Sequence, residues 1–384
     1  MSSNQDFLLM VGDAKDMLKE IPDLSVHCVI TSPPYFRLRD YGIKGQIGNE
    51  DSINDYIQKL IEIFRRVKRV LRDDSTLWIN MGDSYNGSGG QGTNPYIWDK
   101  SVSDKKDGKP INDPSLKKKD LIGIPWRLAL ALQEDGWWLR SDIIWHKTNP
   151  VPESVKDRPS RSHEHIFLFS KSHQYFFDKE ACSEYKGDVW KMSTASRSRK
   201  NHKAVYPREL VRRCLLGAAS IKGCCSKCLA PVIRKIIPPN ISPSSSITKK
   251  GVVLNKKDSG IVKYIEETGI GGYRIAIDGD KHYSMVLEQP VKGGKTSQIK
   301  NKGYIFTYWG LYKKYEWEKT CDCNDDIVPC TILDPFSGSG TTGSVALEYG
   351  YNYIGIDINK DDIDFSRKQF CRMDPIFIIE RKKL

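Results

Sequence analysis

Runs of apolar residues recur along the chain at the spacings of strands that alternate with helices. Residues 7–14 form an apolar run that ends in a polar turn, and residues 26–30 form a second run after a short helical stretch. Apolar side chains then recur at helical spacing over residues 53–72, and an apolar strand follows at residues 75–81. Alternation of this kind predicts an α/β fold with a doubly wound, mostly parallel sheet.

Two regions interrupt the alternation. Residues 85–119 are rich in Gly, Asp and Lys, which predicts a long, polar and flexible loop. Residues 231–320 combine Pro and Ser clusters with short alternating apolar runs, which predicts an inserted β-rich module. The α/β domain is then expected to comprise residues 1–230 and 321–384, with residues 231–320 as a separate inserted module.

Between the two interruptions, the pattern predicts a helix over residues 121–136 and a strand over 138–146. Two further apolar runs, 164–170 and 174–178, stand close together and predict a hairpin.

The α/β pattern returns after the insertion, with strands expected at residues 331–333 and 353–358 and helices at 341–350 and 360–370. Only 27 residues follow Asp357, too few to complete a doubly wound sheet. The amino-terminal strands must therefore complete it, so the sequence predicts a circularly permuted strand order.

Composition narrows the class of protein. The net charge of +12 and the pI of about 9.0 fit a polyanionic partner, although a basic soluble protein without one has the same balance. The chain has no uninterrupted apolar segment of roughly 18 residues, so no membrane span is expected. Its amino terminus lacks the basic-then-apolar layout of a secretory signal, so an intracellular, cytoplasmic location is expected.

A candidate cofactor motif stands near the carboxyl end, where Leu333–Thr342 has the sequence LDPFSGSGTT. Gly338 and Gly340 permit a tight turn from a strand into a helix, and they let backbone N–H groups approach a bound group. The next strand ends at Asp357, 17 residues beyond Gly340. This is close to the spacing at which a carboxylate binds ribose hydroxyls in a Rossmann-type site.

The same glycine turn could also be a plain connection between a strand and a helix. It lacks the Lys of a phosphate-binding P-loop and the full Gly-x-Gly-x-x-Gly register of a dinucleotide site. ATP, GTP and NAD are therefore disfavoured as cofactors.

A second motif, Ser32-Pro33-Pro34-Tyr35, follows the second predicted strand. An exocyclic base amine is a poor nucleophile, because its lone pair is delocalised into the ring. The Ser32 hydroxyl and the Pro33 carbonyl can accept the two amine hydrogens, the prolines stiffen the turn, and Tyr35 can stack on a base rotated out of a duplex. The plainer alternative is a stiff turn with a partly buried tyrosine.

In this order, the two motifs resemble those of the β-class (permuted) site-specific DNA amino-methyltransferases of the Ser-Pro-Pro-Tyr type. Further segments similar to this family include Gly123–Arg127, Gly136–Lys147 and His163-Glu164-His165. The resemblance implies the Rossmann-like class I fold of enzymes that use S-adenosylmethionine. The cofactor site that it implies comprises Asp13 near the adenine, Asp357 at the ribose, and Asp334, Pro335, Phe336, Gly338, Gly340, Thr341 and Thr342 toward the methionine moiety.

The implied reaction transfers a methyl group to an exocyclic amine in double-stranded DNA, by base flipping and direct displacement. The base site would be Ser32, Pro33, Pro34 and Tyr35. Serine before Pro-Pro-Tyr favours cytosine N4 by resemblance, with adenine N6 as the alternative. The same resemblance implies a role in a restriction–modification system, with a cognate endonuclease that acts on the same site.

Two other classes of function remain open. One is a methyltransferase that acts on RNA or protein, and the other is a DNA-binding module that has kept the fold without activity. Loss of activity is disfavoured, because Ser32, Tyr35, Asp334 and Asp357 are all present.

The cysteines predict a structural metal site. Cys225 and Cys228 have the C-x-x-C spacing of a zinc half-site, and Cys321 and Cys323 supply a second pair. Cys224 or Cys330 could replace one ligand, and free thiols are the alternative.

The Pro329-Cys330 pair raises the question of cytosine C5 methylation, which uses a Pro-Cys nucleophile. Cys330 precedes the cofactor strand, whereas the base-facing position is already taken by the Ser-Pro-Pro-Tyr loop. C5 chemistry is therefore rejected.

Overall fold

The structure is a computed structural model. It describes residues 6–38, 40, 42–87, 113–182, 185, 187–194, 206–237 and 314–373, and the backbone of five strands within 246–286. Most of the loop expected at 85–119 lies outside these residues. The chain divides into two compact units, one of residues 1–233 with 319–384 and one of residues 234–318.

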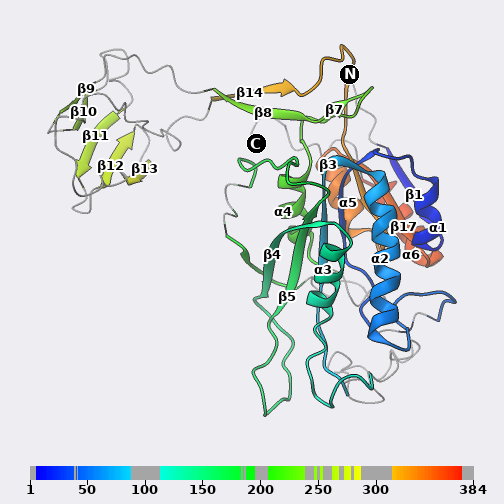
Figure 1. The fold of residues 1–384 in the computed structure, drawn as a ribbon. Helices are drawn as coiled ribbons and strands as arrows, with labels where there is room; N and C mark the ends of the chain where they lie inside the picture. Colours follow the sequence, from blue (N-terminus) through cyan, green and yellow to red (C-terminus); the bar gives the residue numbers. More distant parts are fainter. Residues whose placement is uncertain are drawn as a thin grey trace. The chain divides into compact units, whose positions relative to one another are not determined.

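The first unit is built on a sheet of eight strands in the order β1-β17-β16-β2-β3-β5-β4-β6 (Figure 1). Only β5 runs against its neighbours, so the sheet is mostly parallel, as expected. The strands are β1 (Phe7–Val11), β2 (Val26–Thr31), β3 (Leu71–Met81), β4 (Trp138–Lys147), β5 (His163–Ser170), β6 (Val189–Met192), β16 (Thr331–Asp334) and β17 (Asn352–Asp357).

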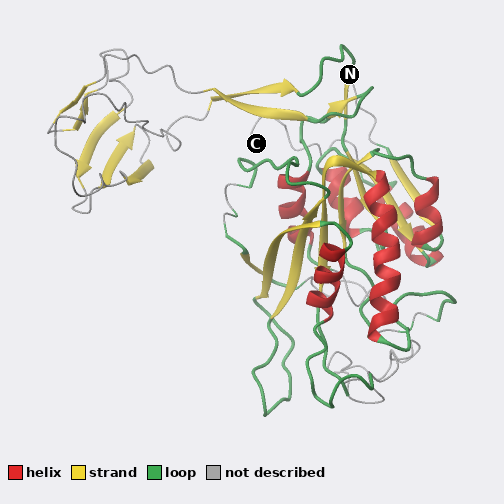
Figure 2. Ribbon diagram, viewed as in Figure 1, coloured by secondary structure: helices red, strands yellow, loops and turns green. Residues whose placement is uncertain are grey.

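Helices cover both faces of this sheet (Figure 2). Strand β2 has apolar side chains on both of its faces. Val29 belongs to the apolar cluster of one face of the sheet, and its neighbours Cys28 and Ile30 belong to the cluster of the other face. Both faces must therefore be covered. One face is covered by α1 (Ala14–Met17), α2 (Ile53–Val70) and α3 (Ile124–Glu134), and the other by α4 (Arg208–Ala218), α5 (Thr341–Glu348) and the end of α6 (Lys360–Phe370).

Helix α2 shows how the apolar pattern becomes structure. The Ser52 side chain caps its first turn by accepting a hydrogen bond from the Asp55 N–H at 3.0 Å. Nine of its residues are buried on one broad face, each worth about 1.5–3 kcal/mol when fully removed from water. The helix ends at Val70 because Leu71 turns into the extended backbone of β3.

The strand order confirms the circular permutation. Strand β1 at the amino end of the chain pairs in parallel with β17 near the carboxyl end, with Val11 opposite Asp357. Strand β16 lies inside the sheet, with β17 and β1 on one side and β2 and β3 on the other. In open sheets of this type, ligands bind outside the carboxyl ends of the strands where the order reverses, here β16 and β2.

The expected hairpin of residues 164–170 and 174–178 is wrong. Strand β5 pairs with β3 along one edge and with β4 along the other. Both edges of β5 are occupied, so residues 174–178 have no place beside it, and they form no strand. The short strand β6 and helix α4 were not expected.

The second unit contains only strands among its described residues. They are β9 (Ser246–Thr248) with β10 (Gly251–Val253), and the antiparallel sheet of β11 (Val262–Glu267), β12 (Gly272–Ile277) and β13 (Lys281–Val286). Strand β8 (Val232–Ile237) pairs with β14 (Lys314–Lys319), and these two carry the chain into and out of the unit.

Within the part of the chain that the structure describes, no helix is both long and apolar enough to cross a membrane.

Candidate active site

The two sequence motifs, about 300 residues apart, meet at one edge of the sheet. Strands β2 and β16 are parallel neighbours, with Val29 opposite Leu333, so their carboxyl ends lie side by side. The Thr31 hydroxyl, just before the Ser-Pro-Pro-Tyr loop, donates a 2.6 Å hydrogen bond to Asp334 at the start of the glycine turn. This contact fixes the two loops relative to each other.

The Asp334 carboxylate is buried inside this junction. Besides Thr31, it accepts hydrogen bonds from the Thr342 hydroxyl at 2.7 Å, the Tyr206 hydroxyl at 3.0 Å and the Phe336 N–H at 3.1 Å. Burial raises the pKa of Asp334, and the four donors oppose that shift. Asp334 and Thr342 are 1% and 0% exposed, and their side chains hold the turn in position.

The glycine turn has the backbone that its sequence requires. Gly338 and Gly340 have φ angles of 49° and 77°, in the left-handed region that favours glycine. A Cβ atom on Gly340 would lie 2.6 Å from the Ser366 hydroxyl of α6, whereas one on Gly338 would meet no atom within 4 Å. The turn therefore packs closely against α6 at Gly340 and leaves open space at Gly338, beside the amino end of α5.

Asp357 ends the neighbouring strand and is oriented by the same turn. Its carboxylate accepts hydrogen bonds from the Gly338 N–H at 2.7 Å and from the Asn359 N–H at 2.8 Å. Burial raises the pKa of Asp357 to about 6, against the effect of these two donors. The Gly12 N–H donates to the Asp357 carbonyl at 2.9 Å, which places the following Asp13, the cap of α1, at the same edge of the sheet.

We expect cofactor binding to weaken as the pH falls below about 6, the pKa of Asp357. An ionised Asp357 would accept charge-assisted bonds from ribose hydroxyls, and about 90% is ionised at pH 7 against about 10% at pH 5. The dissociation constant for S-adenosylmethionine should therefore rise several-fold over this interval, as measured by calorimetry. An Asp357→Asn enzyme should bind weakly at both pH values, and a wild-type affinity that is constant from pH 5 to 7 would contradict the assignment.

The same shift has a consequence for folding stability. Because the pKa of Asp357 is raised in the folded state, its contribution to stability is present below the unfolded value of 3.8 and is lost as the pH rises through about 6. Ionisation of Asp357 therefore lowers the stability of the unliganded fold.

The Ser-Pro-Pro-Tyr loop is held in place by contacts with α2 and by partial burial of its residues. The Tyr56 hydroxyl of α2 donates to the Pro34 carbonyl at 2.8 Å, and Pro33 is buried, while Ser32 and Tyr35 are half-buried. A Cβ atom on Gly82 would come within 2.8 Å of the Tyr35 ring, so glycine is required where β3 ends.

The sequence analysis missed the residues that hold Tyr35. Its hydroxyl donates to the Glu164 carboxylate of β5 at 2.7 Å, and the same carboxylate accepts from Lys147 of β4 at 2.5 Å and from Asn80 of β3 at 3.1 Å. Burial and the adjacent Glu164 carboxylate raise the pKa of Tyr35, so its phenol stays protonated. The His163-Glu164-His165 motif was noted only as a resemblance, because no local pattern shows which strand becomes the neighbour.

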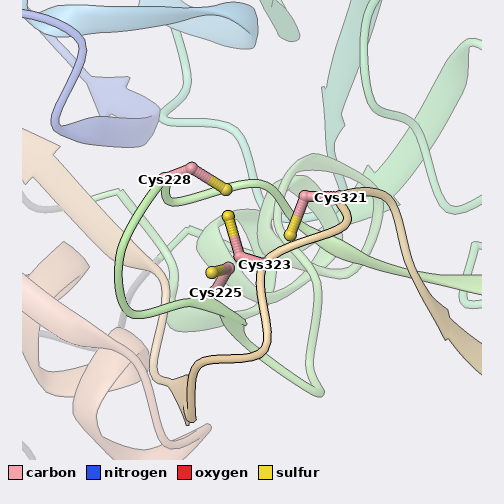
Figure 3. Close-up of side chains that lie close together, drawn as sticks. All are labelled: Cys225, Cys228, Cys321 and Cys323. Atoms are coloured by element: carbon pink, nitrogen blue, oxygen red, sulfur yellow. The ribbon is translucent and has the colours of Figure 1, made fainter.

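Cys225, Cys228, Cys321 and Cys323 are brought together, with all four sulfur atoms within 4.8 Å of one another (Figure 3). Cys224 and Cys330, the two alternative ligands, lie in a separate buried cluster with His27. Both ring nitrogens of His27 already bond to the protein, Nε2 to the Leu229 carbonyl at 2.9 Å and Nδ1 to the Thr331 N–H at 3.1 Å.

Cys330 directly precedes β16, whereas Ser32 directly follows the parallel strand β2. The thiol is therefore at the opposite edge of the sheet from the base-facing loop. This placement agrees with the rejection of C5 chemistry.

Comparisons with known proteins agree with this site. The model of the N6_N4_Mtase family, described as DNA methylase, matches residues 26–223 and 326–368. The type II methyltransferase M.SmaI of Serratia marcescens is 49% identical over 230 residues, which cover 56% of this chain and 76% of that protein. M.SfiI of Streptomyces fimbriatus is 30% identical over an alignment that covers 92% of this chain and 89% of the relative.

Among solved structures, the cytosine-N4-specific PvuII DNA methyltransferase superposes with a TM-score of 0.51 at 14% identity, covering 98% of this chain and 91% of that one. The likeness is one of fold. The chain thus shares the α/β architecture of that DNA methyltransferase, with its mostly parallel central sheet. The chain belongs to the N6/N4 DNA methylase family. It is a type II DNA methyltransferase, with DNA as its substrate.

Proposed function

We propose that this enzyme methylates the N4 amine of cytosine in duplex DNA, with the Ser32–Tyr35 loop as the base site and the Asp334–Thr342 turn as the donor site. The observation that carries the proposal is the 2.6 Å bond between Thr31 and Asp334. It joins the two loops at the point where the strand order reverses, so a base on one loop and a methyl donor on the other meet.

On the donor side, three groups at one edge of the sheet contact the cofactor. Asp357 binds the ribose hydroxyls, and Asp13 lies toward the adenine. The open space at Gly338 and the amino end of α5, which begins at Thr341, accept the methionine moiety. Asp334 acts indirectly, because its buried carboxylate keeps the turn in register with β2 through Thr31.

Pro335 and Phe336 form the first part of the turn. Pro335 is buried, and the half-buried Phe336 packs against the apolar cluster on the face covered by α1, α2 and α3. The apolar side of Phe336 is thereby fixed next to the donor site.

On the base side, the loop prepares the amine for attack. The Ser32 hydroxyl and the Pro33 carbonyl accept the two amine hydrogens, which turns the nitrogen lone pair toward the methyl group. Tyr35, held by Glu164 and flanked by Gly82, offers its ring for stacking on the flipped base. A flipped base is necessary because N4 is not accessible to the donor inside the duplex.

The reaction is a direct displacement at the methyl carbon. The amine nitrogen forms the new N–C bond while the S–C bond of the sulfonium breaks, and its electron pair stays on sulfur. The nitrogen then releases one proton through the acceptors of the loop. The products are the N-methylated base, S-adenosylhomocysteine and a proton.

The choice of cytosine rests on Ser32. A neutral hydroxyl is a weaker acceptor than the carboxylate of an Asp-Pro-Pro-Tyr loop, which would polarise a less reactive amine more strongly. Adenine N6 is the second candidate, because the same acceptors would suit its amine. The enzyme would act inside the cell, beside a restriction endonuclease that cleaves the same site when it is unmethylated.

Sequence recognition is assigned to the unit of residues 234–318, because the sheet is complete without it. Base edges are read by side chains that enter the major groove, whereas the core offers only the flipped-base pocket. Replacing residues 240–312 with a short Gly-Ser linker should leave S-adenosylmethionine affinity within about twofold and abolish site-selective methylation. Methylation of the same sites by the shortened enzyme, as mapped by sequencing, would place recognition elsewhere.

The substrate class can be tested with labelled cofactor. Enzyme and tritiated S-adenosylmethionine are incubated with duplex DNA, single-stranded RNA or a protein mixture, with the Ser32→Ala enzyme as the control. Label should enter duplex DNA alone, and only with wild-type enzyme. Preferential labelling of RNA or protein would contradict the proposal, as would equal labelling by the variant.

A further inference from the structure

A small region beside the methylase core is built from two short strand pairs and two loops. Strand β7 (Cys224–Cys225) pairs with β15 (Ile327–Val328) on the side of the core, and β8 pairs with β14 on the side of the inserted unit. Loops 226–231 and 320–326 join the two pairs. Each loop carries or adjoins one pair of the clustered cysteines.

We propose that Cys225, Cys228, Cys321 and Cys323 bind one Zn²⁺ ion, which cross-links the two chain segments that lead into and out of residues 234–318. The site is separate from the methyl-transfer site, and it does not depend on which base is methylated.

The sulfur atoms have the arrangement of a tetrahedral thiolate site. With a Zn–S bond of about 2.3 Å, a tetrahedron places its four sulfurs about 3.8 Å apart. The four sulfurs of this cluster all lie within 4.8 Å of one another. Figure 3 shows the four side chains close together, two from each of the two chain segments. A small inward movement of each side chain therefore completes the coordination.

The first loop is a tight turn. The Leu229 N–H donates to the Cys225 carbonyl at 2.9 Å. Leu229 has a left-handed φ of 60°, which closes this turn. The sulfur atoms of Cys225 and Cys228 thereby lie within 4.8 Å of each other.

The second loop is held against the first by two hydrogen bonds that need no metal, and a third bond holds the first loop to the core. The Ser226 N–H donates to the Asp326 carbonyl at 2.9 Å, and the Thr320 hydroxyl donates to the Pro231 carbonyl at 2.7 Å. Arg72 of the core donates to the Cys228 carbonyl at 2.8 Å, which fixes the first loop to β3. The two cysteine pairs are thus already placed opposite each other.

The two loops bury little apolar surface of their own, although Leu229 packs against the apolar cluster on the face covered by α4 and α5. Within residues 226–231 and 320–326, only Pro231 is buried. Small segments with so little buried apolar surface are commonly stabilised by a metal or by disulfides. Four free thiols whose sulfur atoms all lie within 4.8 Å of one another match the ligand set of one metal ion.

The position of the site in the chain indicates what it does. Cys323 stands eight residues before Thr331, the first residue of the cofactor strand β16, and Cys321 stands three residues after the inserted unit ends. A metal at this point fixes the start of β16 while it closes the base of an 85-residue insertion. Loss of the metal should therefore loosen the inserted unit before the core.

The direct test is metal content in the full-length protein. Wild-type enzyme purified from zinc-supplemented medium should contain about one zinc per chain, whereas Cys225→Ser and Cys323→Ser enzymes should retain less than about a fifth of that. Cys371→Ser is the matched control, because Cys371 is an exposed cysteine outside the cluster, and its zinc content should equal that of wild type.

A cobalt titration gives a second readout that does not depend on purification. The reduced, metal-free chain should bind one Co²⁺ and show the absorption of a tetrahedral tetrathiolate complex, which zinc then displaces. Limited proteolysis should cut the metal-free chain first within or beside residues 234–318. Failure of the reduced wild-type chain to bind either metal would overturn the proposal. So would full binding by Cys225→Ser, or four of the ten cysteines found as disulfides in metal-free native enzyme.

Discussion

Tyr35→Ala and Ser32→Ala enzymes should bind S-adenosylmethionine normally and fail to methylate DNA at a useful rate. Neither side chain contacts the donor, whereas both contact the base in the proposed complex. Loss of the Tyr35 ring removes base stacking worth about 1–3 kcal/mol, or roughly 5- to 150-fold in rate. Loss of the Ser32 acceptor removes polarisation of the amine and should cost roughly 10²- to 10³-fold in kcat.

The contact between Tyr35 and Glu164 allows a matched control. Tyr35→Phe keeps the ring face and loses only the hydroxyl that donates to Glu164, so its rate should stay within about tenfold of wild type. Single-turnover methylation measures these rates, and calorimetry checks cofactor affinity. Normal turnover by Tyr35→Ala on duplex DNA would end the stacking hypothesis.

Asp357→Ala should lower the affinity for S-adenosylmethionine by tenfold or more. The substitution removes charge-assisted bonds to the ribose, worth about 1.5–3 kcal/mol, and it also releases the Gly338 N–H that orients the turn. Asp361→Ala is the matched control, because Asp361 is an exposed carboxylate in the first turn of α6. Calorimetry that gives equal affinities for Asp357→Ala and wild type would remove Asp357 from the site.

Much of the fold could be predicted because its signals are local. The apolar periodicity of residues 53–72 gave α2 almost to the residue, since a buried face requires side chains at helical spacing. The motif order and the short chain after Asp357 predicted that amino-terminal strands complete the sheet, and the pairing of β1 with β17 confirms it. The strand predicted at residues 174–178 was wrong, because an apolar run does not show that both edges of β5 are already paired with β3 and β4.

Part of the candidate site could likewise be predicted from local signals, and part could not. Ser32, Gly338 and Asp357 follow strand ends, so parallel pairing alone brings them to one edge of the sheet. The contacts of Glu164 with Tyr35 and of Tyr206 with Asp334 span 129 and 128 positions, and no periodicity encodes them. The buried location of Asp334 was also not foreseen, because the motif shows that an acid is present but not which way its side chain points.

Nucleoside mass spectrometry tests the central claim most directly. Unmodified genomic DNA is incubated with the enzyme and S-adenosylmethionine that carries a deuterated methyl group, and the DNA is then digested to nucleosides. The account predicts the deuterated methyl group on the N4 nitrogen of deoxycytidine, and its absence from the Ser32→Ala reaction. Label on the N6 nitrogen of deoxyadenosine, on the C5 carbon of deoxycytidine, or on no nucleoside would contradict it.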